Sequence, residues 1–165
     1  MKLLLPPGWP EPRGYSEGLL AKGQLIFVAG QIGWDTNHRV VSSDFTAQAK
    51  QALRNIVQIL AEGGAEPNTI ARLTWFVKDK REYLASLKEV GAAYRDVIGN
   101  HYPAMSLVQV ADLLEEEAKV EIEATAALPW EEQWLDKWTT SHTRICQRRS
   151  YYRDFFPLRT TIPRN

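Results

Sequence analysis

An alternating segment, VEIEATA within residues 119–127, constrains most strongly what this chain can fold into. The side chains of a β-strand point alternately to the two faces of its sheet. The segment therefore puts its apolar side chains on one face and its polar side chains on the other. The apolar members are Val120, Ile122 and Ala124, and the polar members are Glu121, Glu123 and Thr125. Helices should cover the apolar face, and water or a partner subunit must cover the polar face.

The first 62 residues predict two strands followed by a helix. Residues 16–34 contain two strand-like runs separated by Lys22 and Gly23, which predict a hairpin turn. The second run ends at Gly30, where a glycine indicates a bulge or a close approach of another group. Residues 45–62 carry apolar side chains at helical spacing, with Ser43 or Asp44 as the cap and a Gly-Gly pair as the stop.

The remaining elements complete an α+β pattern. Residues 69–77 predict a strand, residues 80–98 a helix that Gly99 ends, and residues 105–111 and 119–127 two more strands. This order favours one sheet with both helices on the same face.

Composition and motifs exclude several classes of protein. Lys plus Arg and Asp plus Glu number 20 each, so no net field favours nucleic acid or membranes. The only cysteine, Cys146, excludes an internal disulfide framework. The three histidines match no metal-ligand spacing, and phosphate-binding loops and nucleophile elbows are absent from the sequence. We expect a soluble, cytoplasmic protein without a metal site.

The segment 129–165 differs in character from residues 1–128, which we predict to form one domain. Three tryptophans at spacings of four are followed by an arginine-rich stretch. We expect a short amphipathic helix and then a poorly ordered basic tail. A contact with nucleic acid or a membrane through the tail, or no selected role at all, are the alternatives.

Four motifs together resemble the Rid (YjgF-like) family over residues 12–128. They are VAGQIGWD, QALRNIVQILAEGGAE, YPAMSLVQVADL and VEIEATA. The resemblance implies a chorismate-mutase-like fold, with a mixed sheet and two helices on one face. It also implies a homotrimer that closes its sheets into a central barrel, with a cleft between each pair of subunits.

Founding members of the family hydrolyse reactive imines and enamines to ammonia and 2-keto acids, without a metal or cofactor. By resemblance, Glu121 is the catalytic residue that helps water attack the imine carbon. The residues that would bind substrate by the same resemblance are Tyr15, Ala29, Gly30, Gln31, Trp34, Gly91 and Met105.

This sequence departs from the family pattern at the anion clamp. Met105 stands where the family has a carboxylate-binding arginine, Ala29 stands where a serine is usual, and Gly91 replaces a frequent asparagine. A charge-assisted hydrogen bond contributes about 1.5–3 kcal/mol, whereas methionine offers an adaptable apolar surface. The cleft should therefore be more apolar than the family standard, unless another cation, such as Arg95 or His101, takes the place of the arginine.

Two functions from different classes therefore fit the sequence. The first is a deaminase acting on an imine, an enamine or an amino-diene, in the manner of 2-aminomuconate deaminases. The second is a binding module that holds a small metabolite or a protein partner without turnover. Endoribonuclease activity, with which some relatives are described, ranks lower because only the tail is cationic.

Overall fold

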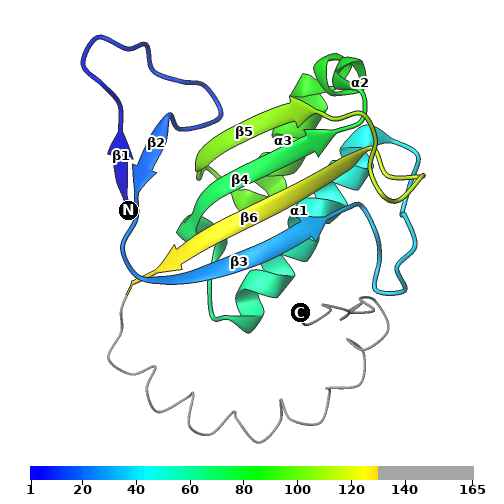
Figure 1. Cartoon of the computed structure of the whole chain (residues 1–165), viewed down its shortest axis with the longest axis horizontal. Coiled ribbons are helices and arrows are strands. Elements are labelled where there is room, and N and C mark those ends of the chain that lie inside the picture. Colours follow the sequence, from blue (N-terminus) through cyan, green and yellow to red (C-terminus); the bar gives the residue numbers. More distant parts are fainter. Residues whose placement is uncertain (130–165) are drawn as a thin grey trace, which may run out of the picture. The chain divides into compact units, whose positions relative to one another are not determined.

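The computed structural model describes residues 1–129, and four strands of that part form the main sheet (Figure 1). The strands are β3 (Gln24–Gln31), β4 (Ile70–Val77), β5 (Ala104–Gln109) and β6 (Val120–Leu128). Their order across the sheet is β3-β6-β4-β5. β6 is antiparallel to both of its neighbours, whereas β4 and β5 are parallel, so the predicted mixed sheet is confirmed.

The three α-helices of residues 1–129 lie on one face of this sheet, where the sequence predicts two helices (Figure 1). They are α1 (Phe45–Glu62), α2 (Lys80–Ala85) and α3 (Leu87–Ile98), and a short 3-10 helix, η1 (Pro67–Thr69), precedes β4. The bounds of α1 are those that the sequence predicts. Of the two candidate caps, Asp44 is the one that acts, since its carboxylate accepts from the Ala47 backbone N–H at 2.8 Å.

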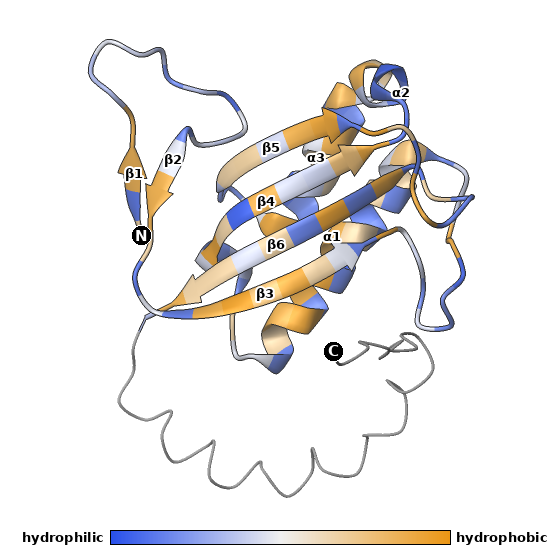
Figure 2. Ribbon diagram, in the orientation of Figure 1, coloured by the Kyte–Doolittle hydropathy of each residue, from blue (hydrophilic) through white to orange (hydrophobic). Residues whose placement is uncertain are grey.

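The alternation in β6 divides the two faces of the sheet as expected. Val120 and Ile122 are fully buried under the helices, and Ala124 is 4% exposed. Figure 2 shows β6 as polar bands between apolar ones. On the opposite, helix-free face, Phe27 of β3 is 74% exposed and Leu25 is 54% exposed. Large apolar side chains on a bare sheet face indicate a surface that something else covers.

The predicted hairpin at Lys22 and Gly23 is wrong. β2 (Gly18–Leu20) pairs instead with β1 (Lys2–Leu4), in a separate two-stranded sheet. The chain passes the end of β6 at Gly23, where an added Cβ would lie 1.6 Å from the Leu128 carbonyl oxygen. β2 and β3 therefore belong to different sheets.

The predicted helix over 80–98 is interrupted at Ser86, which separates α2 from α3. The Ser86 hydroxyl donates to the Glu82 carbonyl at 2.6 Å, and its backbone leaves helical geometry at φ −114° and ψ 20°. A serine side chain that bonds the preceding turn competes with the helix ladder, which accounts for the break.

The predicted tail helix and basic tail lie outside the described residues, except for Pro129. No described helix has the length and apolar character needed to cross a bilayer.

The amide of Gln48 on α1 connects three segments beneath the sheet. It is fully buried, and its Nε2 donates to the Ser42 carbonyl at 2.7 Å and to the Glu117 carbonyl at 2.9 Å. Its Oε1 accepts from the Lys119 backbone N–H at 2.8 Å. This side chain therefore joins the loop before α1 to the loop that enters β6.

Replacing this amide, in Gln48→Leu, should lower the free energy of unfolding by about 2–4 kcal/mol, since buried backbone groups then lose their partners. Urea unfolding at a fixed protein concentration measures the change. Gln58→Leu is the matched control, because Gln58 lies exposed on the same helix. It should change the free energy by no more than about 0.5 kcal/mol. Equal effects of the two substitutions would contradict the role of Gln48.

Candidate functional site

Gly30 and Glu121 form the closest approach among the predicted site residues. The register between β3 and β6 shifts between Val28 and Gln31, so Ala29 and Gly30 have no cross-strand partner. A Cβ on Gly30 would lie 1.7 Å from Oε1 of Glu121. The glycine is therefore needed for the carboxylate to rest against this bulge, and both expectations for Gly30, a bulge and a close approach, are confirmed.

The Glu121 carboxyl is less acidic than an ordinary glutamate. Partial burial raises its pKa, and the nearby carboxylate of Glu123 raises it further. The side chain is half-buried on the helix-free face of the sheet. A carboxyl with a raised pKa can exchange a proton closer to neutral pH than a solvated one can.

Removing the second charge, in Glu123→Gln, should lower the pKa of Glu121, because one of the two causes of its shift disappears. Carboxyl titration followed by NMR measures the midpoint directly. The folded state also loses stability as the pH rises from the unfolded-state pKa of Glu121 to its raised folded-state pKa. The reason is that the unfolded chain loses this proton at lower pH. The variant should therefore lose less stability over that pH interval. An unchanged Glu121 midpoint would contradict the assignment.

Gln31 and Trp34 lie beside this bulge. Gln31 Nε2 donates to the carbonyls of Ala29 and Gly30, both at 3.2 Å, and Trp34 Nε1 donates to Gln31 Oε1 at 3.4 Å. The Trp34 ring stacks on His38, with ring centroids 4.7 Å apart. The structure thus brings five predicted residues together in one group: Ala29, Gly30, Gln31, Trp34 and Glu121.

The other three predicted residues, Tyr15, Gly91 and Met105, line a cavity of about 560 Å³ between α3 and β5. Met105 is half-buried and packs at the edge of the core, so it is both a packing residue and part of the cavity wall. Tyr15 is held there because the neighbouring Ser16 backbone N–H donates to the Pro103 carbonyl at 3.0 Å. The Tyr15 hydroxyl donates to Glu17 at 3.2 Å, and the charge of Glu17 raises the tyrosine pKa.

The two groups lie on opposite faces of the sheet. Met105 pairs with Leu73, which is buried on the helix-covered face. Glu121 pairs with Phe76 and alternates with the buried Val120 and Ile122, so it points to the helix-free face. A single chain therefore does not bring Glu121 and Met105 into one site.

Several cavity residues were not predicted from the sequence. Arg13 and Trp75 line the same space, and so does Arg95, which the sequence analysis named only as a possible substitute cation. The signal for Arg95 was present in the sequence, since it lies four residues after Gly91 and therefore on the same helix face.

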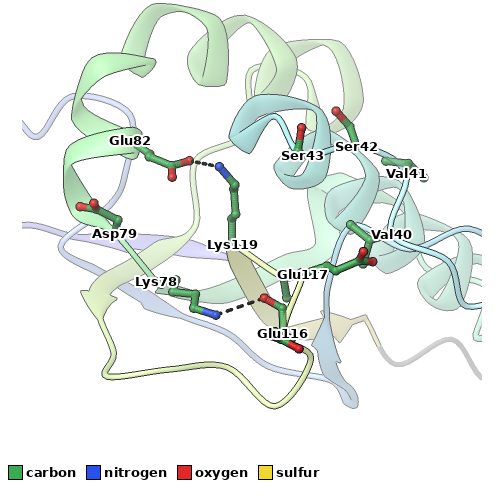
Figure 3. A pocket seen from close by; sticks show the side chains of 11 residues that line it. Val40, Val41, Ser42, Ser43, Lys78, Asp79, Glu82, Glu116, Glu117 and Lys119 are labelled. Carbon is green, nitrogen blue, oxygen red and sulfur yellow. Dashed lines mark hydrogen bonds and ion pairs between the residues drawn. The ribbon is translucent and has the colours of Figure 1, made fainter.

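A second cavity, of about 570 Å³, is a weaker candidate (Figure 3). Both of its lysines are already engaged: Lys119 contacts Glu82 at 2.7 Å, and Lys78 donates to the Glu116 backbone carbonyl at 3.1 Å. Among residues 1–129, no group of three His, Cys, Asp or Glu side chains is arranged to hold a metal ion.

The fold and these two surfaces define a small α+β protein with a half-buried acid on an open sheet face. Residues 10–128 match the model of the family described as Endoribonuclease L-PSP. The chain belongs to this family, which is also called Rid or YjgF-like.

Similar relatives include proteins named as deaminases and proteins named only by family. The 2-iminobutanoate/2-iminopropanoate deaminase of Salmonella typhimurium is 36% identical over 107 residues, which cover 63% of this chain and 80% of that protein. A RutC family protein of Pyrococcus abyssi is 35% identical over 118 residues, covering 71% of this chain and 89% of that one.

Solved structures of the family agree with the fold. The Rid family protein YyfB of Yersinia pestis has a TM-score of 0.67 at 30% identity, covering 77% of this chain and 98% of that one. The YjgF gene product of E. coli has a TM-score of 0.55 at 34% identity, with the same coverage.

Proposed function

We propose that this protein is a deaminase that hydrolyses imines or enamines derived from amino acids, in clefts between the subunits of a homotrimer. The observation that carries the proposal is the Glu121 carboxyl, which has a raised pKa and rests against the Gly30 bulge. Membership of the family and the similarity to 2-iminobutanoate deaminases support an imine deaminase-like function at the level of the family.

The separation of the two groups supports the homotrimer in this proposal. One subunit would supply Glu121 and Gly30, and the next would supply Tyr15, Gly91 and Met105. Such a head-to-tail contact, repeated around a closed ring, makes every cleft identical. It would also cover Leu25 and Phe27, which the isolated chain leaves exposed on the helix-free face.

In the proposed reaction, water adds to the C=N carbon of a 2-imino acid, ammonia leaves, and a 2-keto acid remains. Glu121 would accept a proton from the attacking water and return it to the departing nitrogen. The β3 register shifts at Ala29 and Gly30, and the backbone of this bulge would hold the substrate beside that carboxyl. These assignments, together with ligand contacts from Gln31 and Trp34, are part of the proposal.

The test uses the full chain and a 2-imino acid formed in the assay by an L-amino-acid oxidase. The protein should accelerate formation of ammonia and 2-keto acid above the rate in buffer, and light scattering should give the mass of three chains. Both 2-iminobutanoate and 2-aminomuconate should be offered. Rates equal to buffer with every substrate would remove the deaminase assignment.

A binding module without catalysis is the second candidate, favoured by Met105 in the clamp position and by the aromatic wall around it. It predicts ligand-dependent thermal stabilisation without product. Ribonuclease activity ranks below both candidates, and a cytoplasmic location stays a prediction from the sequence.

A further inference from the structure

The cavity between α3 and β5 has an unbalanced lining. Two arginines, Arg13 and Arg95, contribute to it, and no carboxylate does. Its walls are otherwise mostly apolar and aromatic, and they include Trp75, Tyr83 and Tyr102. A cavity of about 560 Å³ with cations and rings but no acid fits an organic anion with a bulky apolar part.

The guanidinium of Arg95 extends back along α3 over Gly91. A Cβ added to Gly91 would lie 3.4 Å from Arg95 Nη1, so a larger residue at position 91 would compete for this space. Position 91 is frequently an asparagine in the family. In this chain it is a glycine, and the guanidinium of Arg95 lies over it. This arrangement places a cation on the wall that Met105 also lines.

No carboxylate on the same helix neutralises Arg95. The positions three and four residues away along the helix are Gly91, Ala92, Ile98 and Gly99. The adjacent Asp96 pairs with Lys50 instead, at 2.6 Å. Within residues 1–129, none of the ion pairs includes Arg95.

The other cation considered in the sequence, His101, is already engaged. Its Nε2 lies 2.6 Å from the Ile70 carbonyl oxygen, and its own carbonyl accepts from the Tyr94 hydroxyl at 2.8 Å. His101 also does not line the cavity, whereas Arg95 does.

A buried indole ring contributes to the same wall. Trp75 is 2% exposed, and its Nε1–H is buried without a hydrogen-bond partner among the described residues. Trp75 therefore offers the cavity apolar ring surface.

We propose that Arg95 binds the substrate carboxylate in place of the missing family arginine, and that the aromatic cavity selects a bulky, aryl or long-chain substituent. This inference rests on the proposed function and names the substrate class of that site. The guanidinium can hold a carboxylate through two parallel hydrogen bonds, while the ring walls and Met105 pack against the apolar part.

The test measures binding of phenylpyruvate, a 2-keto acid with an aryl group, to the full chain by isothermal titration calorimetry. Arg95→Gln should weaken this affinity by about 10-fold or more, since a charge-assisted pair is lost. Arg54→Gln is the matched control, because Arg54 is exposed on α1 and does not line the cavity, and it should leave the affinity unchanged. The uncharged analogue phenylacetamide should bind equally to wild type and Arg95→Gln.

Two further measurements complete the test. Pyruvate should bind more weakly than phenylpyruvate, since it cannot fill the cavity. Adding Met105→Arg to Arg95→Gln should restore affinity. Absent phenylpyruvate binding, equal affinities in wild type and Arg95→Gln, or pyruvate binding as tightly as phenylpyruvate would each overturn the inference.

Binding and turnover separate this inference from the proposed function. Arg95-dependent binding without ammonia release would leave the inference standing and remove the deaminase. Turnover of the phenylalanine-derived imine with a KM unaffected by Arg95→Gln would remove the inference and leave the deaminase assignment standing. Circular dichroism and the mass in solution should match wild type in each variant, as expected for an exposed arginine.

Discussion

Glu121→Gln is expected to lower kcat for imine hydrolysis by about 10²–10⁴-fold, the usual contribution of a positioned general base or acid. The amide has nearly the same shape, so it can still rest against Gly30, but it cannot accept and return a proton. Because the carboxyl lies at the bulge and not in the cavity beside Met105, KM should change much less than kcat. Steady-state ammonia release over a range of imine concentrations separates the two.

Glu62→Gln is the matched control for this substitution. Glu62 lies exposed at the end of α1, far along the chain from either group of site residues. Its kcat should equal that of wild type. A Glu121→Gln enzyme with a normal kcat would show that Glu121 does not take part in proton transfer.

Mixed assemblies of two impaired variants should be more active than either parent. One parent is Glu121→Gln. The other is Gly91→Phe, which fills the cavity with a ring, while the atom nearest the added Cβ is only the flexible tip of Arg95. If each cleft combines the two halves of neighbouring subunits, equal random mixing in a ring restores about one quarter of the wild-type clefts.

Refolding the two variants together, separately and in unequal ratios measures this recovery. The recovered activity should be highest when the two variants are refolded together in near-equal amounts. Variants that are refolded separately and then mixed should show no recovery. A mixture no more active than the sum of its parents would mean that each chain carries its whole site, which contradicts the division between two faces of the sheet.

Local pattern predicted the fold well wherever one chain segment determined the result. The bounds of α1 follow from its cap and its glycine stop, and the inward face of β6 follows from alternation. The bulge at Gly30 was predictable because a glycine at the end of a strand commonly marks an irregular register or a close neighbour.

The break at Ser86 was a local error, but the other errors arose where distant segments compete. β2 pairs with β1 from the start of the chain, and Gly23 lies against Leu128 at the end of β6; sequence spacing carries no information on either contact. Arg95 was recognisable as a cation near the site, but its position over Gly91 depends on α3 packing beside β5. The family motifs show that Met105 stands in place of the carboxylate-binding arginine. They do not indicate which residue could bind the carboxylate instead.

The place of β6 has a consequence for how the chain folds as it is made. It is the last strand in the described sequence, yet it lies between β3 and β4 and pairs with both. A nascent chain that stops before Val120 holds β3 and β4 with no strand to join them. The sheet must therefore close late, through contacts between residues about a hundred positions apart, and such non-local pairing makes folding slow. Until then the helices have no complete surface to cover, and their apolar faces depend on protection from aggregation during synthesis.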